Sequence, residues 1–176
     1  MKHKRYEKIG EDLYFGQLRN GLNVNVVTKP GFRLSYAVFA TNYGGALRRF
    51  SLGGKMHDTP AGVAHFLEHK MFDMPDGDNA LSVLSANGAQ PNAFTSSGMT
   101  AYFFDCTSGF EENLRMLLKF VSTPYFTQET VDKEQGIIGQ EICMVEDNPG
   151  YVVYNRLMRM LYEFNPIRDQ VAVSIG

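Results

Sequence analysis

The stretch "TPAGVAHFLEHKMF", residues 59 to 72, constrains the fold of this chain more than any other. It places His65, Glu68 and His69 within five positions of an otherwise apolar run. On a helix the two histidines lie on one face, one turn apart, and the glutamate lies on nearly the same side. Thr59 can cap such a helix and Pro60 suits its first position, so we expect a helix that continues to Phe72.

Two interpretations of this helix compete, a core helix with two satisfied histidines and a metal site. The chain has only four histidines, and two of them stand at ligand spacing around a glutamate. A helix buried on most sides would avoid three ionisable groups on one face, because burying them unpaired is costly. Two imidazoles four residues apart can share a metal ion, and Glu68 can take a proton from a water beside it. The pentapeptide "HFLEH" is the H-x-x-E-H pattern of inverzincins, which favours the metal site.

A catalytic zinc site needs a third protein ligand and one open position. The carboxylates available in "KEQGIIGQEICMVEDNP" are Glu134, Glu141, Glu146 and Asp147. Glu134 and Glu141 are seven residues apart and share a helix face, but a solvated acidic face would show the same spacing. The spacing alone leaves the choice among the four open.

The remaining chain alternates between groups of strands and groups of helices. Strand patterns fall in 13–30 (a hairpin that turns at Asn20-Gly21), 34–40 and 89–107, and residues 41–58 have the glycine-rich, polar composition of a loop. Helix patterns fall in 79–88, 109–123, from Thr127 to 147 and from Pro149 to 164. The helix at 109–123 is amphipathic, with Leu114, Leu117, Leu118 and Val121 on one face. This order lacks regular β-α-β alternation, so it predicts an α+β layer structure with much antiparallel pairing.

Length and charge exclude several classes of function. The 176 residues suit a single domain, and the ending "AVSIG" without a closing element predicts a piece of a longer protein. A net charge of -2, from 17 basic and 19 acidic residues, leaves no room for a large basic patch and disfavours nucleic acid as a partner. No apolar run has membrane-spanning length, and the basic N-terminus lacks the apolar region of a secretory signal. Cys106 and Cys143 have no metal-type spacing, so we expect reduced thiols and a cytoplasmic protein.

Four segments resemble, in order, those of the insulinase (pitrilysin) family of zinc peptidases, which includes the mitochondrial processing peptidase. They are "GVAHFLEHKMF", "GAQPNAFTSSGMTAYFF", "EQGIIGQEICMVEDNP" and "YEFNPIRDQVAVSIG", and the resemblance runs from about Tyr14 to the end. It implies a two-layer α+β sandwich, a mostly antiparallel (mixed) sheet packed with helices, as in the LuxS/mitochondrial processing peptidase-like metallohydrolases. The Asn165-Pro166 pair stands where family members commonly have His-Pro, at a position not expected to touch the metal.

The resemblance also assigns roles to the candidate residues. His65 and His69 match the histidine ligands of zinc, and Glu141 matches the third ligand. Glu68 matches the general base. Glu134 matches a second glutamate, whose expected role is to orient a ligand from the outer shell.

The implied function is a zinc metalloendopeptidase that cleaves peptides bound in extended conformation. Asn92, Ala93 and Phe94 match the edge strand that pairs with the substrate backbone. The family's transition-state arginine and tyrosine come from a later domain or a partner subunit, so we expect a second homologous unit to complete the active site. The isolated 176 residues would then bind zinc without cleaving peptides.

Two other functions compete with this one. The first is a non-catalytic partner or scaffold subunit, which has no need to keep both histidines and the glutamate of the motif. The second is a metal hydrolase with a small-molecule substrate, which has no use for a peptide-binding edge strand in "NAFTSSGMTAYFF".

Overall fold

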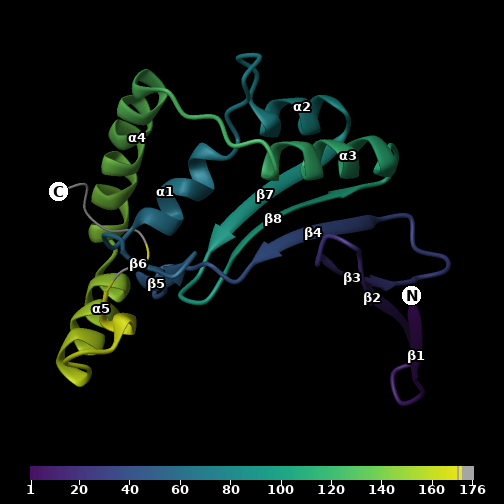
Figure 1. Ribbon diagram of the computed structural model, residues 1–176, viewed down its shortest axis with the longest axis horizontal. Helices are drawn as coiled ribbons and strands as arrows, with labels where there is room; N and C mark the ends of the chain where they lie inside the picture. The colour runs from purple at the N-terminus through teal and green to yellow at the C-terminus, as the bar shows by residue number, and fades with distance from the viewer. Residues whose placement is uncertain (170, 172–176) are drawn as a thin grey trace. The chain divides into compact units, whose positions relative to one another are not determined.

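The computed structural model describes residues 1–169 and 171, and the chain divides into two compact units, Met1–Leu34 and Ser35–Gly176 (Figure 1). The last residues of the segment 162–176, which carries part of the family resemblance, lie outside the described residues. Among the helices described, none has the length and apolar character needed to cross a membrane.

The first unit is an antiparallel sheet in the order β1-β2-β3, formed by Lys2–Tyr6, Glu11–Gln17 and Asn23–Val27. The predicted hairpin is confirmed, and Gly21 supplies the positive φ of 89° that its turn requires. Strand β1 was not predicted, because its basic and polar residues lack apolar alternation. Its ladder is supported by ion pairs from His3 and Arg5 to Asp12, at 2.7 and 2.8 Å.

The second unit is built on an antiparallel sheet in the order β4-β8-β7, formed by Ser35–Thr41, Thr100–Cys106 and Ala89–Thr95. Three helices pack against it: α1 (Val63–Lys70), α2 (Ala80–Ala86) and α3 (Phe110–Val121) (Figure 1). The period-2 alternation of β8 turns Tyr102, Phe104 and Cys106 toward the helices, where all three are buried. The predicted α+β class, with helices packed on an antiparallel sheet, is confirmed.

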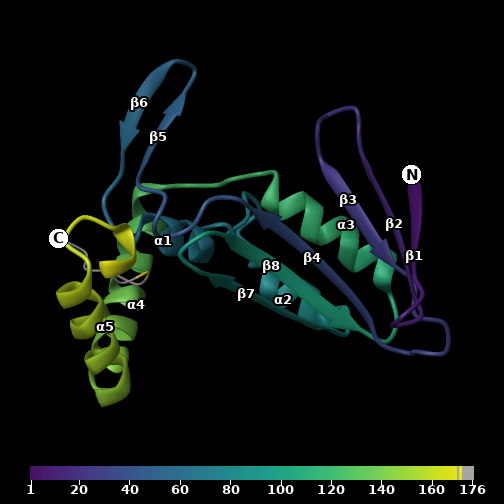
Figure 2. The same cartoon turned by 90° about the horizontal axis from the view of Figure 1, so that it is seen from below.

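The prediction of a loop over residues 41–58 is wrong in its second half. Strands β5 (Arg49–Leu52) and β6 (Lys55–Asp58) pair in an antiparallel hairpin, which projects from the sheet and helices of its unit (Figure 2). Gly53 and Gly54 form its two-residue connection with φ of 58° and 78°. Two positive φ values are what a tight hairpin turn demands, so these glycines mark a turn within a hairpin.

Helix α1 begins at Val63, so the predicted start at Thr59 is wrong. Gly62 precedes the helix with φ of 88°, a left-handed conformation that glycine adopts without strain. Thr59 instead bonds to the carbonyl of Arg48, from its N–H at 2.9 Å and from its hydroxyl at 3.0 Å, and so closes the β5–β6 hairpin. The helix ends at Lys70, two residues before the predicted end.

Two further helices follow, α4 (Gln128–Glu146) and α5 (Pro149–Leu161), and then a short 3-10 turn, η1 (Pro166–Arg168). The starts predicted from Thr127 and Pro149 are confirmed, because the Thr127 hydroxyl accepts from the N–H of Thr130 and Pro149 opens α5. Helix α4 contacts α1, which is how a distant segment reaches the histidine motif.

The core lies between the β4-β8-β7 sheet and the helices. Its most buried large side chains include Phe104, Leu117, Phe120 and Leu84, each no more than 1% exposed. The predicted apolar face of α3 is wrong at one position, since Leu118 is 40% exposed. Phe120 lies in the core instead, against Phe72 and Tyr102.

We expect Phe104→Ala to lower the free energy of unfolding by about 3–5 kcal/mol, because it removes a fully buried ring and leaves a cavity. Phe164→Ala is the matched control: this ring is 87% exposed, and its loss should change the free energy of unfolding by less than about 1 kcal/mol. Urea-induced unfolding measures both variants. Equal losses in the two would contradict the assignment of the core.

Candidate metal centre

The contact between α1 and α4 brings His65, His69 and Glu141 together (Figure 1). One carboxylate oxygen of Glu141 lies 3.7 Å from Nε2 of His65, and the other lies 3.6 Å from Nε2 of His69. The two imidazole rings, one helical turn apart, have centroids separated by 4.6 Å. A single atom could therefore be in contact with all three side chains.

The donor atoms of these three residues fit a metal ion. One donor atom from each residue lies within 4.8 Å of the donor atoms of the other two. A tetrahedral centre with bonds of about 2.0–2.2 Å separates its ligand atoms by roughly 3.3–3.6 Å, close to the distances between Glu141 and the histidines. Two imidazoles and one carboxylate form the donor set of catalytic zinc sites that keep a fourth position open. Among the residues that the structure describes, Glu141 is the carboxylate that joins the two histidines in such a group.

Glu134 lies two turns before Glu141 on α4, and it contacts the opposite nitrogen of His69. Its Oε1 lies 2.8 Å from Nδ1 of His69. A carboxylate there fixes the proton on Nδ1 and leaves Nε2 as the nitrogen that can bind a metal. This contact agrees with the orienting role predicted for Glu134, which remains a prediction.

Burial favours the metal-binding form of His65. Burial and the neighbouring His69 lower the pKa of His65, while the carboxylates of Glu141, Glu68 and Glu134 oppose that shift. A lowered pKa keeps the imidazole in its neutral form, which is the form that binds a metal.

Glu68 also lies on α1, and it is only 7% exposed. One of its carboxylate oxygens accepts a hydrogen bond of 2.5 Å from the hydroxyl of Thr95, the last residue of β7. Burial and the charge of Glu68 raise the pKa of the nearby Tyr102, so its phenol stays protonated. Thr95 lies in segment 88–104, which resembles the family, but no role for it could be predicted, because nothing in the spacing of the motif shows that the end of β7 lies against α1.

Asn92, Ala93 and Phe94 lie in β7, at one edge of the β4-β8-β7 sheet. The side chain of Ala93 packs against the core, whereas Phe94 is 45% exposed and Asn92 is also exposed. Helix α1, with the histidine motif, packs against the same strand. The predicted substrate strand and the candidate metal centre are thus neighbours, and the binding role of these three residues remains a prediction.

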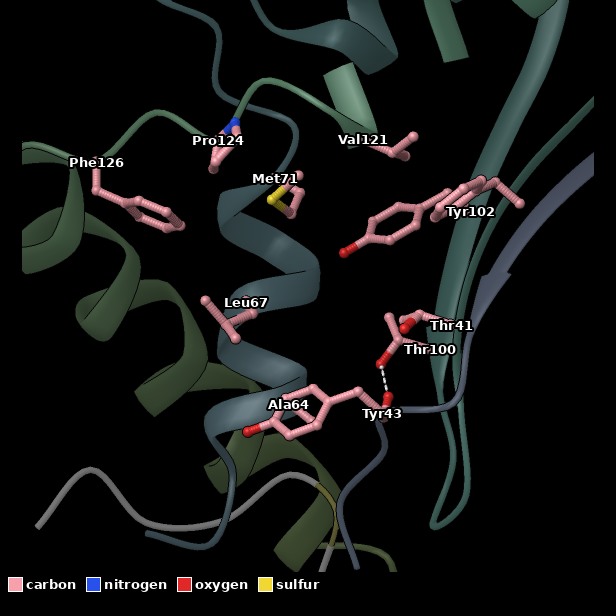
Figure 3. A pocket seen from close by; sticks show the side chains of 11 residues that line it. Thr41, Tyr43, Ala64, Leu67, Met71, Thr100, Tyr102, Val121, Pro124 and Phe126 are labelled. Carbon is pink, nitrogen blue, oxygen red and sulfur yellow. Dashed lines mark hydrogen bonds between the residues drawn. The ribbon is translucent and has the colours of Figure 1, made fainter. Parts of the chain in front are cut away.

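A pocket of about 400 Å³ lies on a different face of α1 (Figure 3). It is lined by Ala64 and Leu67 of α1 and by Met71, the residue that follows the helix. Tyr43 and Tyr102 also line it. The pocket is mainly apolar and none of the three candidate ligands lines it, so it is separate from the metal centre.

The model of the insulinase family (peptidase family M16) matches residues 52–173 of the chain. The chain belongs to the insulinase family. This stretch contains the histidine motif, the β7–β8 hairpin and helix α4.

Relatives and solved structures agree with this assignment. A Bacillus subtilis (strain 168) protein named uncharacterized zinc protease YmfH is 47% identical over 99% of this chain and 41% of its own length. Human insulin-degrading enzyme is 28% identical over 71% of the chain and 12% of its own length. The structure of a protein from Alicyclobacillus acidocaldarius, described as an M16-like peptidase, matches with a TM-score of 0.89 and 40% identity over 94% of the chain and 39% of its own length. This insulinase-family chain therefore spans about two fifths of the length of the first of these relatives and of that structure.

We expect Glu134→Gln to weaken the zinc affinity of this insulinase-family chain by about 10- to 100-fold, because the amide no longer holds His69 as the carboxylate does. Glu146→Gln is the matched control, since Glu146 is exposed near the end of the same helix. Competition with a chromogenic chelator measures both affinities. An equal affinity in wild type and Glu134→Gln would contradict the orienting role.

Proposed function

We propose that this chain is the metal-binding part of a zinc-dependent metalloendopeptidase. The observation that carries the proposal is that His65, His69 and Glu141 each offer a ligand atom within 4.8 Å of the other two. Glu68 lies on α1, the helix that carries both histidines. Relatives named zinc proteases support zinc as the ion at this centre. Zinc held by these three side chains would polarise the scissile carbonyl and lower the pKa of a bound water.

Glu68 acts as the general base in this proposal. Glu68 lies three residues after His65 on α1, and its carboxylate is near enough to that imidazole to influence its pKa, so it can reach a water at the metal centre. It takes a proton from the attacking water and passes it to the amine that leaves when the peptide bond breaks. Its low exposure lowers the local dielectric constant, which strengthens its hydrogen bonds.

The edge of β7 aligns the peptide substrate. One side of β7 pairs with β8, and among the described residues no strand pairs with the other side. An extended peptide can add to that edge through main-chain hydrogen bonds near Asn92, Ala93 and Phe94. Pro91 lacks a backbone N–H, a residue tolerated at the edge of a sheet but not at its centre.

A second homologous domain or subunit completes the active site in this proposal. It supplies the arginine and tyrosine that the family resemblance implies for the transition state. The share of the relatives that this chain spans, 41% of the Bacillus subtilis protein, leaves room for such a unit. The competing function, a non-catalytic partner subunit, is disfavoured because the three candidate ligands and Glu68 are all present and assembled.

We expect Glu68→Gln in the full-length protein to reduce kcat for peptide cleavage by about 10²- to 10⁴-fold, because the amide cannot accept a proton. Zinc content should stay at the wild-type level, since Glu68 is not one of the ligands. Hydrolysis of an internally quenched peptide mixture and metal analysis measure the two effects. Glu111→Gln, at a carboxylate 72% exposed on α3, serves as the control and should match wild type. Cleavage by Glu68→Gln at the wild-type rate would rule out the mechanism.

We also expect a strong chelator to abolish peptide hydrolysis by the full-length protein, and added zinc to restore it. The reason is that the proposed mechanism relies on the metal ion to polarise the scissile carbonyl. The same quenched peptides measure the activity before and after treatment, and metal analysis shows that the ion was removed. Activity that persists in metal-free protein would contradict the assignment.

A further inference from the structure

We propose that Thr95 is a positioning residue that sets the orientation of the Glu68 carboxylate. This inference rests on the proposed function, because it gives Thr95 a role in the reaction that Glu68 performs. Thr95 is neither a candidate ligand nor part of the strand segment expected to bind substrate, and it acts through its contact with Glu68.

The contact makes the two oxygens of the Glu68 carboxylate unequal. The Thr95 hydroxyl donates to Oε2 at 2.5 Å, and a short bond to an ionised acceptor belongs to the stronger class of hydrogen bonds. Within the described chain, Oε1 receives no such bond, and it is not among the fully buried atoms that lack a partner. In this proposal Oε1, which has no such donor among the described residues, is the oxygen that accepts a proton from water.

Thr95 lies opposite a second threonine in the ladder. Thr95 and Thr100 are direct partners in the β7–β8 ladder, and their hydroxyl oxygens are 3.2 Å apart. Thr100 is 3% exposed, and its hydroxyl donates to the carbonyl of Tyr43 at 2.8 Å (Figure 3). Each hydroxyl has one proton, so the proton of Thr95 goes to Glu68 and that of Thr100 goes to its closer acceptor, the Tyr43 carbonyl. The two β-branched side chains have few accessible rotamers, which fixes the donor beneath the carboxylate.

The turn between these threonines is also fixed. Residues 44–46 lie against it, with the N–H of Gly45 bonded to the carbonyl of Ser96 at 2.9 Å and that of Ala46 to the carbonyl of Ser97 at 3.0 Å. A Cβ on Gly44 would lie 2.5 Å from the backbone N of Met99 and 2.5 Å from the carbonyl oxygen of Ser96. This close approach of two backbone segments requires glycine, and it holds the ends of both strands in register.

Loss of the Thr95 hydroxyl should therefore act on Glu68 alone. The terminal torsion of a glutamate is broad, so a carboxylate without this donor can rotate out of the orientation that the hydrogen bond fixes. Misplacement of a catalytic group by about 1 Å can cost about 100-fold in rate. The candidate ligands, the zinc content and the binding of substrate at the β7 edge should be unchanged.

Thr95→Val and Thr95→Ser in the zinc-loaded full-length protein test this role. Valine keeps the shape and removes the donor, whereas serine keeps the donor and removes a methyl group. We expect Thr95→Val to lower kcat for the quenched peptide mixture by about 10- to 100-fold, with KM within about threefold of wild type and zinc content unchanged. Thr95→Ser should stay within about threefold of the wild-type kcat. A Thr95→Val kcat equal to that of wild type, or an equal loss in both variants, would overturn the proposal.

A double variant separates this inference from the proposed function. If Thr95 acts through Glu68, adding Thr95→Val to Glu68→Gln should produce no further loss of kcat. Full wild-type activity in Glu68→Gln would mean that the proposed function fails, whereas an inactive Glu68→Gln beside a fully active Thr95→Val would mean that only the role of Thr95 fails.

Crystal structures of wild type and Thr95→Val give a readout that does not depend on turnover. In wild type we expect Oε2 of Glu68 to be bonded to the Thr95 hydroxyl, and in Thr95→Val we expect the carboxylate to be rotated or to occupy two orientations. A single, unchanged orientation in Thr95→Val would also overturn the proposal.

Discussion

The contact between α1 and α4 is the interaction on which the candidate site depends. Helix α1 has only eight residues and carries His65 and His69, but it has no third ligand of its own. Helix α4 supplies both a ligand candidate, Glu141, and the partner of His69, Glu134, two turns apart on one face. A small displacement of either helix would separate Glu141 from the histidines and Glu134 from His69 at once. The position of α4 on α1 therefore determines whether the donor atoms meet.

Burial requires a partner for each ionisable group of this arrangement. Ionisable groups removed from water are costly unless each finds a partner, and the groups of α1 find theirs on different elements. His69 contacts Glu134 on α4, and Glu68 accepts from Thr95 at the end of β7. The carboxylates around His65 oppose the fall in its pKa, but burial and the neighbouring His69 outweigh them. The neutral form of His65 is thereby favoured, which suits a site that receives a cation.

The sequence was sufficient for the parts of the fold that depend on local patterns. The H-x-x-E-H motif predicted a helix with a polar face, and the caps at Thr127 and Pro149 located the starts of α4 and α5. The start of α1 could not be predicted, because Thr59 is a good helix cap by type and instead closes a hairpin with Arg48. That contact joins residues eleven positions apart, and helix-capping preferences alone do not reveal it.

The residues of the candidate site likewise fall into those that sequence spacing predicts and those that depend on packing. His65 and His69 follow from spacing, since one helix places both of them. Glu141 could not be separated from the other carboxylates of its segment by spacing, because the choice depends on how two helices pack. The family resemblance indicated Glu141, and the structure places its oxygens between the two imidazoles. Thr95 lies in segment 88–104, which resembles the family, but its role could not be predicted from the sequence, because it arises only where the end of β7 meets α1.

A short helix can hold a site of this kind because its polar groups also fix its position. Lys70, the last residue of α1, is fully buried and pairs with Asp73 at 2.5 Å, so the end of the helix is tied to the segment that follows. Glu68 is tied to β7 and His69 to α4. On the remaining face, Ala64, Leu67 and Met71 present apolar surface to the pocket beside the sheet. Apolar packing alone would allow such a helix to slide or rotate, whereas buried hydrogen bonds and ion pairs are strong only in a narrow range of geometry. The residues that do the proposed chemistry are therefore also those that determine where the helix lies.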